Sequence, residues 1–310
     1  MRQRPYMLAT WRAGKPVIIA NSIGIKIMTE HPALMPGRVA VVTGAASGIG
    51  RAAALRFAAL GLKVCLADLP SDALEAARAA EAVASPLGEA GTIAVPTDVA
   101  DLTQVQALAD TAYNQFGEVA VMMNNAATGA FGAPWKNMDV WRHLLEINLF
   151  GVINGVQVFT PRMLAQGTGC AIINTGSKQG ITCPPGNTAY NVSKAGVKVL
   201  TEALAHGLRN EPGAHITAHL LIPGSTFTGM TEGNHKEKPP GAWTPDQVVD
   251  MLINGITAND FYILCPDNEV TRDTDNKRIL WAAQDIIYNR PPLSRWHADY
   301  KDAFAAFLKA

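Results

Sequence analysis

Residues 38–61 read RVAVVTGAASGIGRAAALRFAALG, and this stretch decides the fold. It begins with a short apolar run rich in valine, which is typical of a buried β-strand. The residues from 48 onward have the pattern of an amphipathic helix. Gly44, Gly48 and Gly50 lie where the two segments meet. The sequence therefore predicts a strand that passes through a tight glycine turn directly into a helix.

A glycine turn in that position suits a phosphate ligand. Without side chains, the backbone lets a pyrophosphate approach the amide groups at the helix N-terminus, where the peptide dipoles favour negative charge. Turns use glycine for other reasons too, so the strand before it and the helix after it carry the inference. Asp68 follows Gly50 by eighteen residues, at the end of the apolar run KVCLAD. A carboxylate at that spacing can accept both ribose hydroxyl groups of an adenosine, which predicts a dinucleotide site.

Asp68 also predicts which dinucleotide is bound. Its carboxylate would repel a 2′-phosphate, and neither Ser47 nor Leu69 supplies a compensating positive charge. These residues favour NAD over NADP. The alternative interpretation is that Asp68 is a solvated acid in the turn DLPSD.

Short apolar runs alternate with helical stretches from Gly37 onward, which predicts βαβ units. We expect a doubly wound (Rossmann) α/β fold with a parallel seven-stranded sheet and helices on both faces. The expected strands are residues 38–44, 63–68, 92–99, 119–127, 171–177, 216–224 and 260–267. The expected domain boundaries are an N-terminal extension over 1–36, the NAD-binding catalytic domain over 37–268, and a C-terminal helical extension of that domain over 269–310.

Helix boundaries have clear signals at several positions. Asp101 with Gln104, and Thr244 with Gln247, form capping-box patterns that predict two helix starts. The first of these helices should end near Gly117, and a long helix should run from 141 to 159. In the C-terminal extension, residues 276–289 and 297–310 are expected to form two further helices.

Composition excludes several classes of protein. Of the 310 residues, 48% are apolar and 17% charged, as in a soluble globular enzyme. Lys and Arg number 26, as do Asp and Glu, so no net charge attracts nucleic acid or anionic lipid. No apolar run approaches the ~20 residues that cross a membrane. Four separated cysteines indicate reduced thiols in a cytoplasmic protein, and no His/Cys cluster predicts a metal.

The first 29 residues are basic and contain no acid before Glu30. Such a segment can be a transit peptide, but serine is scarce and no cleavage site is evident. A packing arm, or residues upstream of the natural start, are the other interpretations. We favour the second of these because Met28 and Met35 both precede the first strand.

The stretch NTAYNVSKAG, residues 187–196, places Tyr190 and Lys194 on one face of a helix. A free phenol has a pKa of about 10, which is too high for a base at neutral pH. A neighbouring ammonium group would lower that pKa. An isolated pair of this kind is more often a surface contact worth a few tenths of a kcal/mol, so its meaning depends on the nucleotide turn upstream.

Taken in order, these motifs resemble the classical short-chain dehydrogenase/reductase (SDR) family over residues 37–265. TGAASGIG (43–50) resembles the family's cofactor turn, and NNAA (124–127) is similar to its NNAG. Ser177 lies thirteen residues before Tyr190, which is the family's spacing. Asp98 with Val99, Asn148 in INLFG, and PGSTFT (223–228) match the family's adenine pair, helix asparagine and nicotinamide segment.

The resemblance implies a role for each matching residue. Tyr190 would be the acid/base, and Ser177 would hold the reacting oxygen. Lys194 would bind the nicotinamide ribose, and Asn148 would hold a water that connects Lys194 to solvent. The expected cofactor-binding residues are Gly44, Ser47, Gly48, Ile49, Gly50, Asp68, Leu69, Asp98, Val99, Asn125, Ala126, Ala127, Tyr190, Lys194, Pro223, Gly224, Thr226 and Thr228.

The expected function is oxidation of a hydrophobic secondary alcohol, or reduction of its ketone, with NAD. The expected substrate pocket is mainly apolar and comprises Phe131, Gln179, Cys183, Phe227 and Met230. Residues 229–243 are expected to form a mobile lid. The alternatives are an NADP-linked carbonyl reductase and a catalytically silent NAD-sensing protein. A homodimer or homotetramer follows from the resemblance, although the C-terminal extension departs from the family and puts its usual tetramer packing in question.

Overall fold

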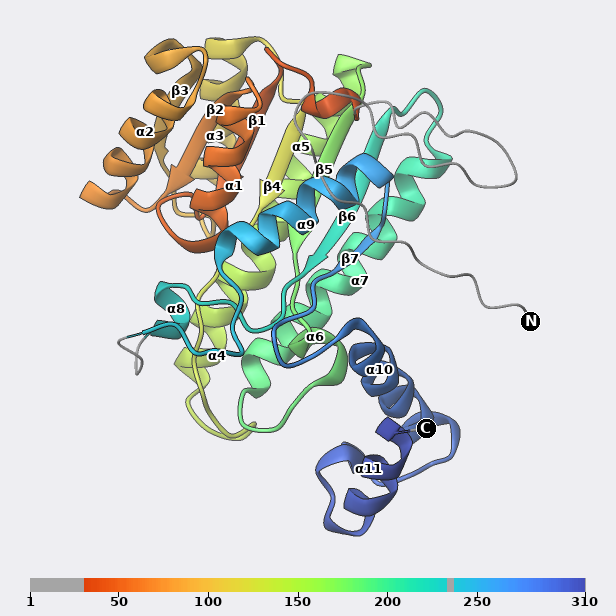
Figure 1. Cartoon of the computed structure of the whole chain (residues 1–310). Coiled ribbons are helices and arrows are strands. Elements are labelled where there is room, and N and C mark those ends of the chain that lie inside the picture. The colour runs from red at the N-terminus through yellow and green to blue at the C-terminus, as the bar shows by residue number, and fades with distance from the viewer. Residues whose placement is uncertain (1–30, 233–236, 310) are drawn as a thin grey trace.

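The computed structural model describes residues 31–232 and 237–309. These residues form one seven-stranded sheet in the order β3-β2-β1-β4-β5-β6-β7, and every neighbouring pair is parallel (Figure 1). The strands are β1 (Val39–Thr43), β2 (Lys63–Asp68), β3 (Thr92–Pro96), β4 (Val121–Asn124), β5 (Cys170–Thr175), β6 (Ile216–Ile222) and β7 (Tyr262–Leu264). The predicted doubly wound α/β fold is confirmed.

Helices cover both faces of this sheet, and the apolar strand residues are buried between them. One face packs against α1 (Gly48–Ala59), α2 (Asp72–Ala84) and α9 (Pro245–Ala258). The other face packs against α3 (Leu102–Phe116), α5 (Gly151–Gln166) and α7 (Thr188–Asn210). The remaining α-helices are α4 (Met138–Leu145), α6 (Gln179–Thr182), α8 (Gly229–Glu232), α10 (Arg272–Ile287) and α11 (Lys301–Lys309).

The predicted capping signals fix two of these helices. The Asp101 side chain accepts from the backbone N–H groups of Thr103 and Gln104, and α3 ends at a left-handed Gly117. At α9, Thr244 and Gln247 form the reciprocal capping box. Both helices therefore begin where the sequence indicated.

The long helix predicted over residues 141–159 differs from a regular helix. It begins earlier, as α4, and continues as α5 to Gln166. Between them, Glu146–Phe150 form a π-helical turn. Such a turn inserts one extra residue and occurs frequently at functional sites. Asn148 lies at its centre.

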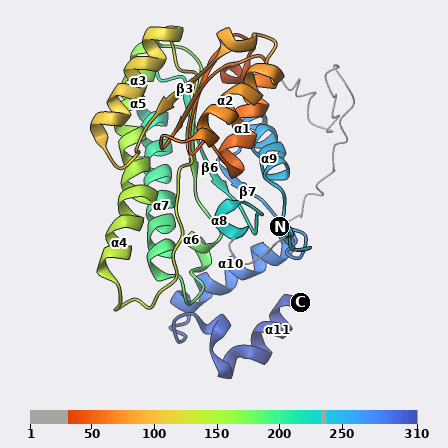
Figure 2. The same cartoon turned by 90° about the vertical axis from the view of Figure 1, so that its left-hand side faces the viewer.

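The C-terminal extension lies near α6, at the end of the molecule where the strands finish (Figures 1 and 2). Its helix α10 begins at Arg272, four residues before the predicted start, because Thr271 caps it. Trp281 is buried beside Phe304 and Phe307 of α11. The extension thus has a small apolar centre of its own. The predicted domain boundaries stay predictions, and residues 1–30 of the N-terminal extension lie outside the described residues.

Within the described ranges, no helix is long and apolar enough to span a membrane. The same residues contain no group of three or more His, Cys, Asp or Glu that could hold a metal ion. All four cysteines are free thiols.

Glu81 on α2 is an unusual core residue. It is fully buried, and neither carboxylate oxygen has a hydrogen-bond partner among the described residues. Burial raises the pKa of Glu81 to about 8, and Arg51 opposes that rise. The folded protein therefore holds a proton there that the unfolded chain releases at lower pH. Its free energy of unfolding should decrease as pH rises from about 4.5 to about 8.

We expect Glu81→Gln to raise the melting temperature more at pH 8 than at pH 5, because the amide cannot acquire charge. Each kcal/mol gained should raise it by roughly 2–4 °C. Thermal unfolding at both pH values measures the difference. Glu75→Gln on the same helix is the control, since Glu75 is exposed and paired with Arg78. An equal shift at both pH values for Glu81→Gln would contradict the prediction.

Candidate active site

The turn between β1 and α1 leaves no room for a side chain at Gly44 or Gly50. Gly44 and Gly48 have left-handed backbones, with φ of +68° and +55°. A Cβ on Gly50 would lie 2.1 Å from the Gly44 carbonyl oxygen, and one on Gly44 would lie 2.8 Å from Ala126 Cα. The turn therefore packs directly against the segment that follows β4. Its bare backbone at a helix N-terminus fits a dinucleotide pyrophosphate.

Thr43 and Asn125 join three strand ends at this edge. The Thr43 hydroxyl accepts from the N–H groups of Asn125 (2.9 Å) and Ala126 (3.2 Å). The Asn125 side chain donates to the Thr43 carbonyl oxygen and accepts from the Thr175 hydroxyl. These contacts draw residues 125–127 out of the sheet, so β4 ends at Asn124 and the longer strand predicted to residue 127 is wrong. Thr43 and Thr175, the last residues of β1 and β5, were not among the residues predicted from the sequence to belong to the site.

Asp68 is held against the glycine turn. One carboxylate oxygen accepts from the Ala46 N–H and the other from the Leu69 N–H, both at 2.8 Å. Leu69 is exposed, and Ser47 caps α1 without a side-chain hydrogen bond. The carboxylate therefore has a fixed place against the glycine turn, as expected for a group that accepts the ribose hydroxyls of an adenosine.

Asp98 and Val99 follow β3 at the same edge. The Asp98 carboxylate accepts from the Ala100 N–H at 3.0 Å, and Asn154 of α5 donates to the Val99 carbonyl oxygen at 2.9 Å. A Cβ on Gly151 would lie 2.7 Å from a Val99 methyl carbon. Both residues are thus fixed at the carboxyl end of the sheet, on the far side of β2 from β1.

The segment 223–228 reaches across to the glycine turn. A Cβ on Gly48 would lie 3.1 Å from the Thr228 methyl carbon, so these two parts of the predicted cofactor site touch. The Thr226 hydroxyl donates to the Gly224 carbonyl oxygen, and Pro223 accepts from the Lys178 N–H. This segment therefore also contacts the loop that carries Ser177.

The structure brings Ser177, Tyr190 and Lys194 together at the carboxyl end of β5. Lys194 is buried, donates to the Thr175 carbonyl oxygen at 2.8 Å, and lies 5.8 Å from the Tyr190 ring centroid. Burial lowers the pKa of Lys194 to about 8. Burial also raises the pKa of Tyr190 above its ordinary value, and a hydrogen bond with Ser177 opposes that rise.

The direction of the Tyr190 shift differs from the sequence expectation that Lys194 lowers its pKa. Desolvation penalises the phenolate more than the surrounding residues stabilise it, and the Lys194 ammonium group is directed to the Thr175 carbonyl oxygen. Further positive charge near the phenol is therefore needed before Tyr190 can act as a base at neutral pH.

Asn148 fixes the loop after β4. Its side chain accepts from the Thr128 N–H at 2.7 Å and donates to the Thr128 carbonyl oxygen at 2.8 Å. The same amide group lies 3.4 Å from the hydroxyl of Ser193, the neighbour of Lys194 in the chain. Asn148 thus ties this loop to the helix that carries Tyr190 and Lys194. Its expected water-holding role stays a prediction.

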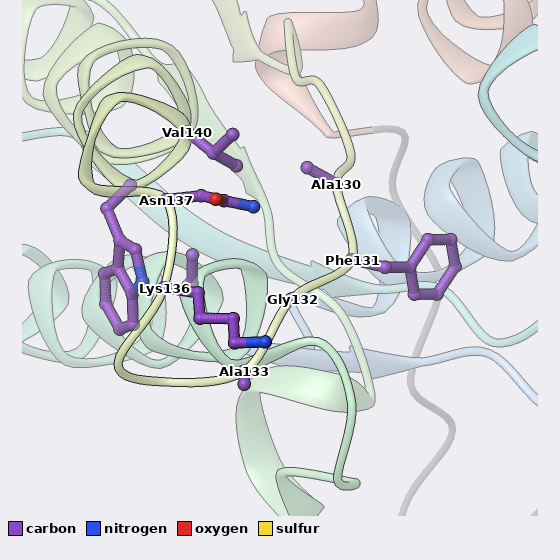
Figure 3. A pocket seen from close by; sticks show the side chains of 9 residues that line it. Ala130, Phe131, Gly132, Ala133, Lys136, Asn137 and Val140 are labelled. Carbon is purple, nitrogen blue, oxygen red and sulfur yellow. The ribbon is translucent and has the colours of Figure 1, made fainter.

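The predicted substrate residues surround the same edge but do not form one enclosed pocket. A Cβ on Gly129 would lie 3.4 Å from Met230 Cγ, so α8 meets the loop after β4. Phe131 is 84% exposed and points away from Val140 and Asn137 in Figure 3. The shallow cavity there, about 10 Å³, is lined by Ala130, Phe131, Gly132, Ala133, Lys136, Asn137, Val140, Trp141 and Ala189.

The other three predicted substrate residues lie on neighbouring segments. Gln179 begins α6 and accepts from the Asn187 amide at 3.4 Å. Cys183 follows α6 in a left-handed conformation and is partly buried. The Phe227 N–H donates to the Trp243 carbonyl oxygen. Sequence reasoning missed Lys136, which lines the shallow cavity, because nothing in PWKN marked it. Of the predicted lid, residues 233–236 lie outside the described residues.

Comparisons with known proteins agree with this geometry. The family model for short chain dehydrogenases matches residues 38–239. The chain is 32% identical over 267 residues to 1-deoxy-11-beta-hydroxypentalenate dehydrogenase of Streptomyces exfoliatus, covering 84% of this chain and 94% of that protein. It is also 32% identical over 216 residues to 3beta-hydroxysteroid dehydrogenase 2 of Eggerthella lenta, covering 68% of this chain and 80% of that protein.

Among solved structures, a short chain dehydrogenase/reductase from Burkholderia phymatum in complex with NAD matches with a TM-score of 0.75. The two chains are 35% identical, and the match covers 83% of this chain and 97% of that one. Fold, motif order and relatives all agree. The chain therefore belongs to the short-chain dehydrogenase/reductase family of oxidoreductases.

Proposed function

We propose that this oxidoreductase transfers a hydride between a hydrophobic secondary alcohol, or its ketone, and NAD, with Tyr190 as the acid/base. The observation that carries the proposal is the convergence of Ser177, Tyr190 and Lys194 at one strand end. The glycine turn and Asp68 lie at the same edge of the sheet. A nucleotide site without such a group could bind NAD but could not move a proton.

In the direction of oxidation, Tyr190 takes the hydroxyl proton of the alcohol while hydride leaves its carbon. Ser177 holds the reacting oxygen and stabilises the charge that develops there. Lys194 binds the nicotinamide ribose and keeps a positive charge near the phenol. When bound, oxidised NAD supplies the hydride acceptor and the additional positive charge that the raised pKa of Tyr190 calls for.

The preference for NAD rests on Asp68. Because two backbone N–H groups fix its carboxylate, Asp68 cannot easily turn away from a 2′-phosphate. The NAD complex of the Burkholderia phymatum relative supports this choice. The residues expected to hold the cofactor are those of the glycine turn, Asp68, Asp98 with Val99, residues 125–127 and segment 223–228.

The substrate class follows from the surfaces around the site. Met230, Phe227 and Phe131 are apolar, and all three are partly or largely exposed at this edge. The name of the Streptomyces exfoliatus relative places a hydroxyl group on pentalenate, and that of the Eggerthella lenta relative places one on a steroid. We infer that the substrate of this enzyme is an apolar, cyclic compound that carries a hydroxyl or keto group.

The proposal includes a cytoplasmic homodimer or homotetramer. Val192 and Val199 on α7 are 44% and 62% exposed, which supports an additional apolar contact of this helix. Light scattering of the purified protein measures the mass of the assembly.

A panel of apolar secondary alcohols with NAD tests the proposed reaction through the absorbance of NADH. Because burial raises the pKa of Tyr190, we expect oxidation to become faster from about pH 6 to about pH 7.5, as the phenolate fraction grows while Lys194, with a pKa of about 8, stays charged. Reduction of the matching ketone should become slower over the same range, since it needs the protonated phenol. The measurement is kcat/KM against pH in both directions.

Two outcomes would contradict this proposal. Oxidation that slows between these pH values would exclude Tyr190 as the base. NAD binding by calorimetry, without turnover of any alcohol or ketone in the panel, would favour the silent NAD-sensing alternative.

A further inference from the structure

Lys178, the residue after Ser177, belongs to a buried ionic network. Its ammonium nitrogen lies 2.6 Å from Asp275 Oδ2 and 3.3 Å from Asp267 Oδ2. The three side chains are only 16%, 5% and 8% exposed, respectively. Charges removed from water in this way are strongly unfavourable without partners, so each member depends on the others. We call Lys178, Asp267 and Asp275 the lysine network.

The lysine network packs directly against the backbone of the segment 223–228. A Cβ on Gly224 would lie 2.7 Å from Asp267 Oδ2 and 2.8 Å from Lys178 Nζ. The same Asp267 oxygen is 3.4 Å from the Ser225 nitrogen, which donates to it. The backbone of the predicted nicotinamide segment therefore contacts these charged groups. A side chain at residue 224 would displace Lys178 and Asp267.

The lysine network also fixes the loop that carries Ser177. The Lys178 N–H donates to the Pro223 carbonyl oxygen at 3.2 Å. The Lys178 carbonyl oxygen accepts from the N–H and the hydroxyl of Thr182, which closes the short helix α6. The Ser177 hydroxyl accepts from the Gln179 N–H at 3.1 Å. With residue 178 held at its backbone and its side chain, the orientation of residue 177 is restricted.

One member of the lysine network comes from the C-terminal extension. Asp275 lies in the first turns of α10, which packs against α6, and both views show these helices side by side (Figures 1 and 2). Ile279 of α10 joins the apolar cluster that contains Ile181 of α6 and Val197 of α7. The extension thus contacts the serine loop by charge and the tyrosine helix through a shared apolar cluster.

We propose that Asp275 is a positioning residue, which acts through Lys178 to hold Ser177 and segment 223–228 in their reactive places. The C-terminal extension therefore contributes a residue that supports the active site. This inference rests on the proposed function, because it assigns to Ser177 and to the segment the roles given above.

The first test compares Asp275→Asn with Asp273→Asn. Both changes are isosteric and lie in the same turn of α10, but Asp273 is 74% exposed and pairs with Lys277 outside the network. We expect Asp275→Asn to lower kcat roughly tenfold or more and to raise KM for NAD, because small displacements of reacting groups are costly. Asp273→Asn should change neither by more than about twofold. A merely unstable variant would lose active molecules without a change in KM.

The second test asks whether Asp275 acts through Lys178. The loss in Lys178→Met should match the loss in the double variant with Asp275→Asn, since the pathway is already broken in the single variant. Asp275→Glu, which keeps the charge, should recover most of kcat. Hydrogen–deuterium exchange of peptides covering 176–182 and 223–228 should increase in Asp275→Asn and stay at the parent level in Asp273→Asn.

The outcomes separate this inference from the proposed function. An active parent with equal kinetics in Asp275→Asn and Asp273→Asn overturns the role of Asp275 and leaves the proposed function intact. A parent that oxidises no alcohol in the panel overturns the proposed function, and the exchange experiment then decides whether Asp275 orders the two loops. Unchanged exchange in both peptides overturns the inference whatever the activity. Asp275→Ser, which also removes the charge, serves the same comparison if Asp275→Asn does not fold.

Discussion

Tyr190→Phe is expected to lower kcat for alcohol oxidation by roughly 10²–10⁴-fold, while NAD still binds. The substitution removes one hydroxyl group and keeps the ring that lies 5.8 Å from the Lys194 ammonium. It therefore removes the proposed proton acceptor and the hydrogen bond with Ser177, with little change in packing. Stopped-flow or steady-state measurement of NADH formation gives kcat, and quenching of NADH fluorescence gives the affinity for the cofactor.

Tyr113→Phe is the matched control for that experiment. Tyr113 is also partly buried, and its hydroxyl donates to the Gln166 side chain at 3.2 Å, on α3 and away from the strand ends. The same chemical change there should leave kcat within about twofold of the parent. If Tyr190→Phe keeps the parent rate, proton transfer belongs to another group and the proposed mechanism is wrong.

The second large effect concerns the choice of cofactor. The parent should use NAD with a kcat/KM roughly 10²-fold above that for NADP, because Asp68 faces the 2′-phosphate with a like charge. Asp68→Ser combined with Leu69→Arg removes that charge and adds a positive one. We expect this double variant to reverse the preference. Kinetics with both cofactors and one alcohol substrate measure the ratio.

Asp72→Ser controls for the loss of an acid in this region. Asp72 is exposed at the start of α2 and has no part in the glycine turn. Its replacement should leave the ratio of NAD to NADP use unchanged. Equal use of the two cofactors by the parent would show that Asp68 does not select between them, and would favour the NADP-linked alternative.

The fold could be predicted because its signals are local. The run from β1 through the glycine turn to α1, and the capping residues of α3 and α9, each lie within a few neighbouring residues. The π-helical turn could not be predicted, because its extra residue is stabilised by Asn148 bonding to Thr128 twenty positions away. The pattern of apolar residues along the helix gives no sign of a hydrogen-bond partner so far away in the sequence.

In the candidate site, too, the local features could be predicted and the long-range contacts could not. The spacing of Ser177, Tyr190 and Lys194 on one loop and one helix is visible in the sequence, and the structure does bring them together. The direction of the Tyr190 pKa was not visible, since it depends on how much protein surrounds the phenol. The lysine network was missed for a related reason: Asp267 is 89 residues from Lys178 along the chain. The sequence around 265–275 showed only that the chain departs from the family there.

Asp275 has a consequence for how this enzyme could have arisen. A chain that ended after its last strand would have Asp267 as the acidic partner of Lys178 and would lack Asp275. The positioning role proposed for Asp275 implies that the lysine and the acid-bearing helix are gained or lost together. Within the family, a lysine directly after the reactive serine should co-occur with an acid-bearing helix beyond β7, and together the two traits should define a lineage.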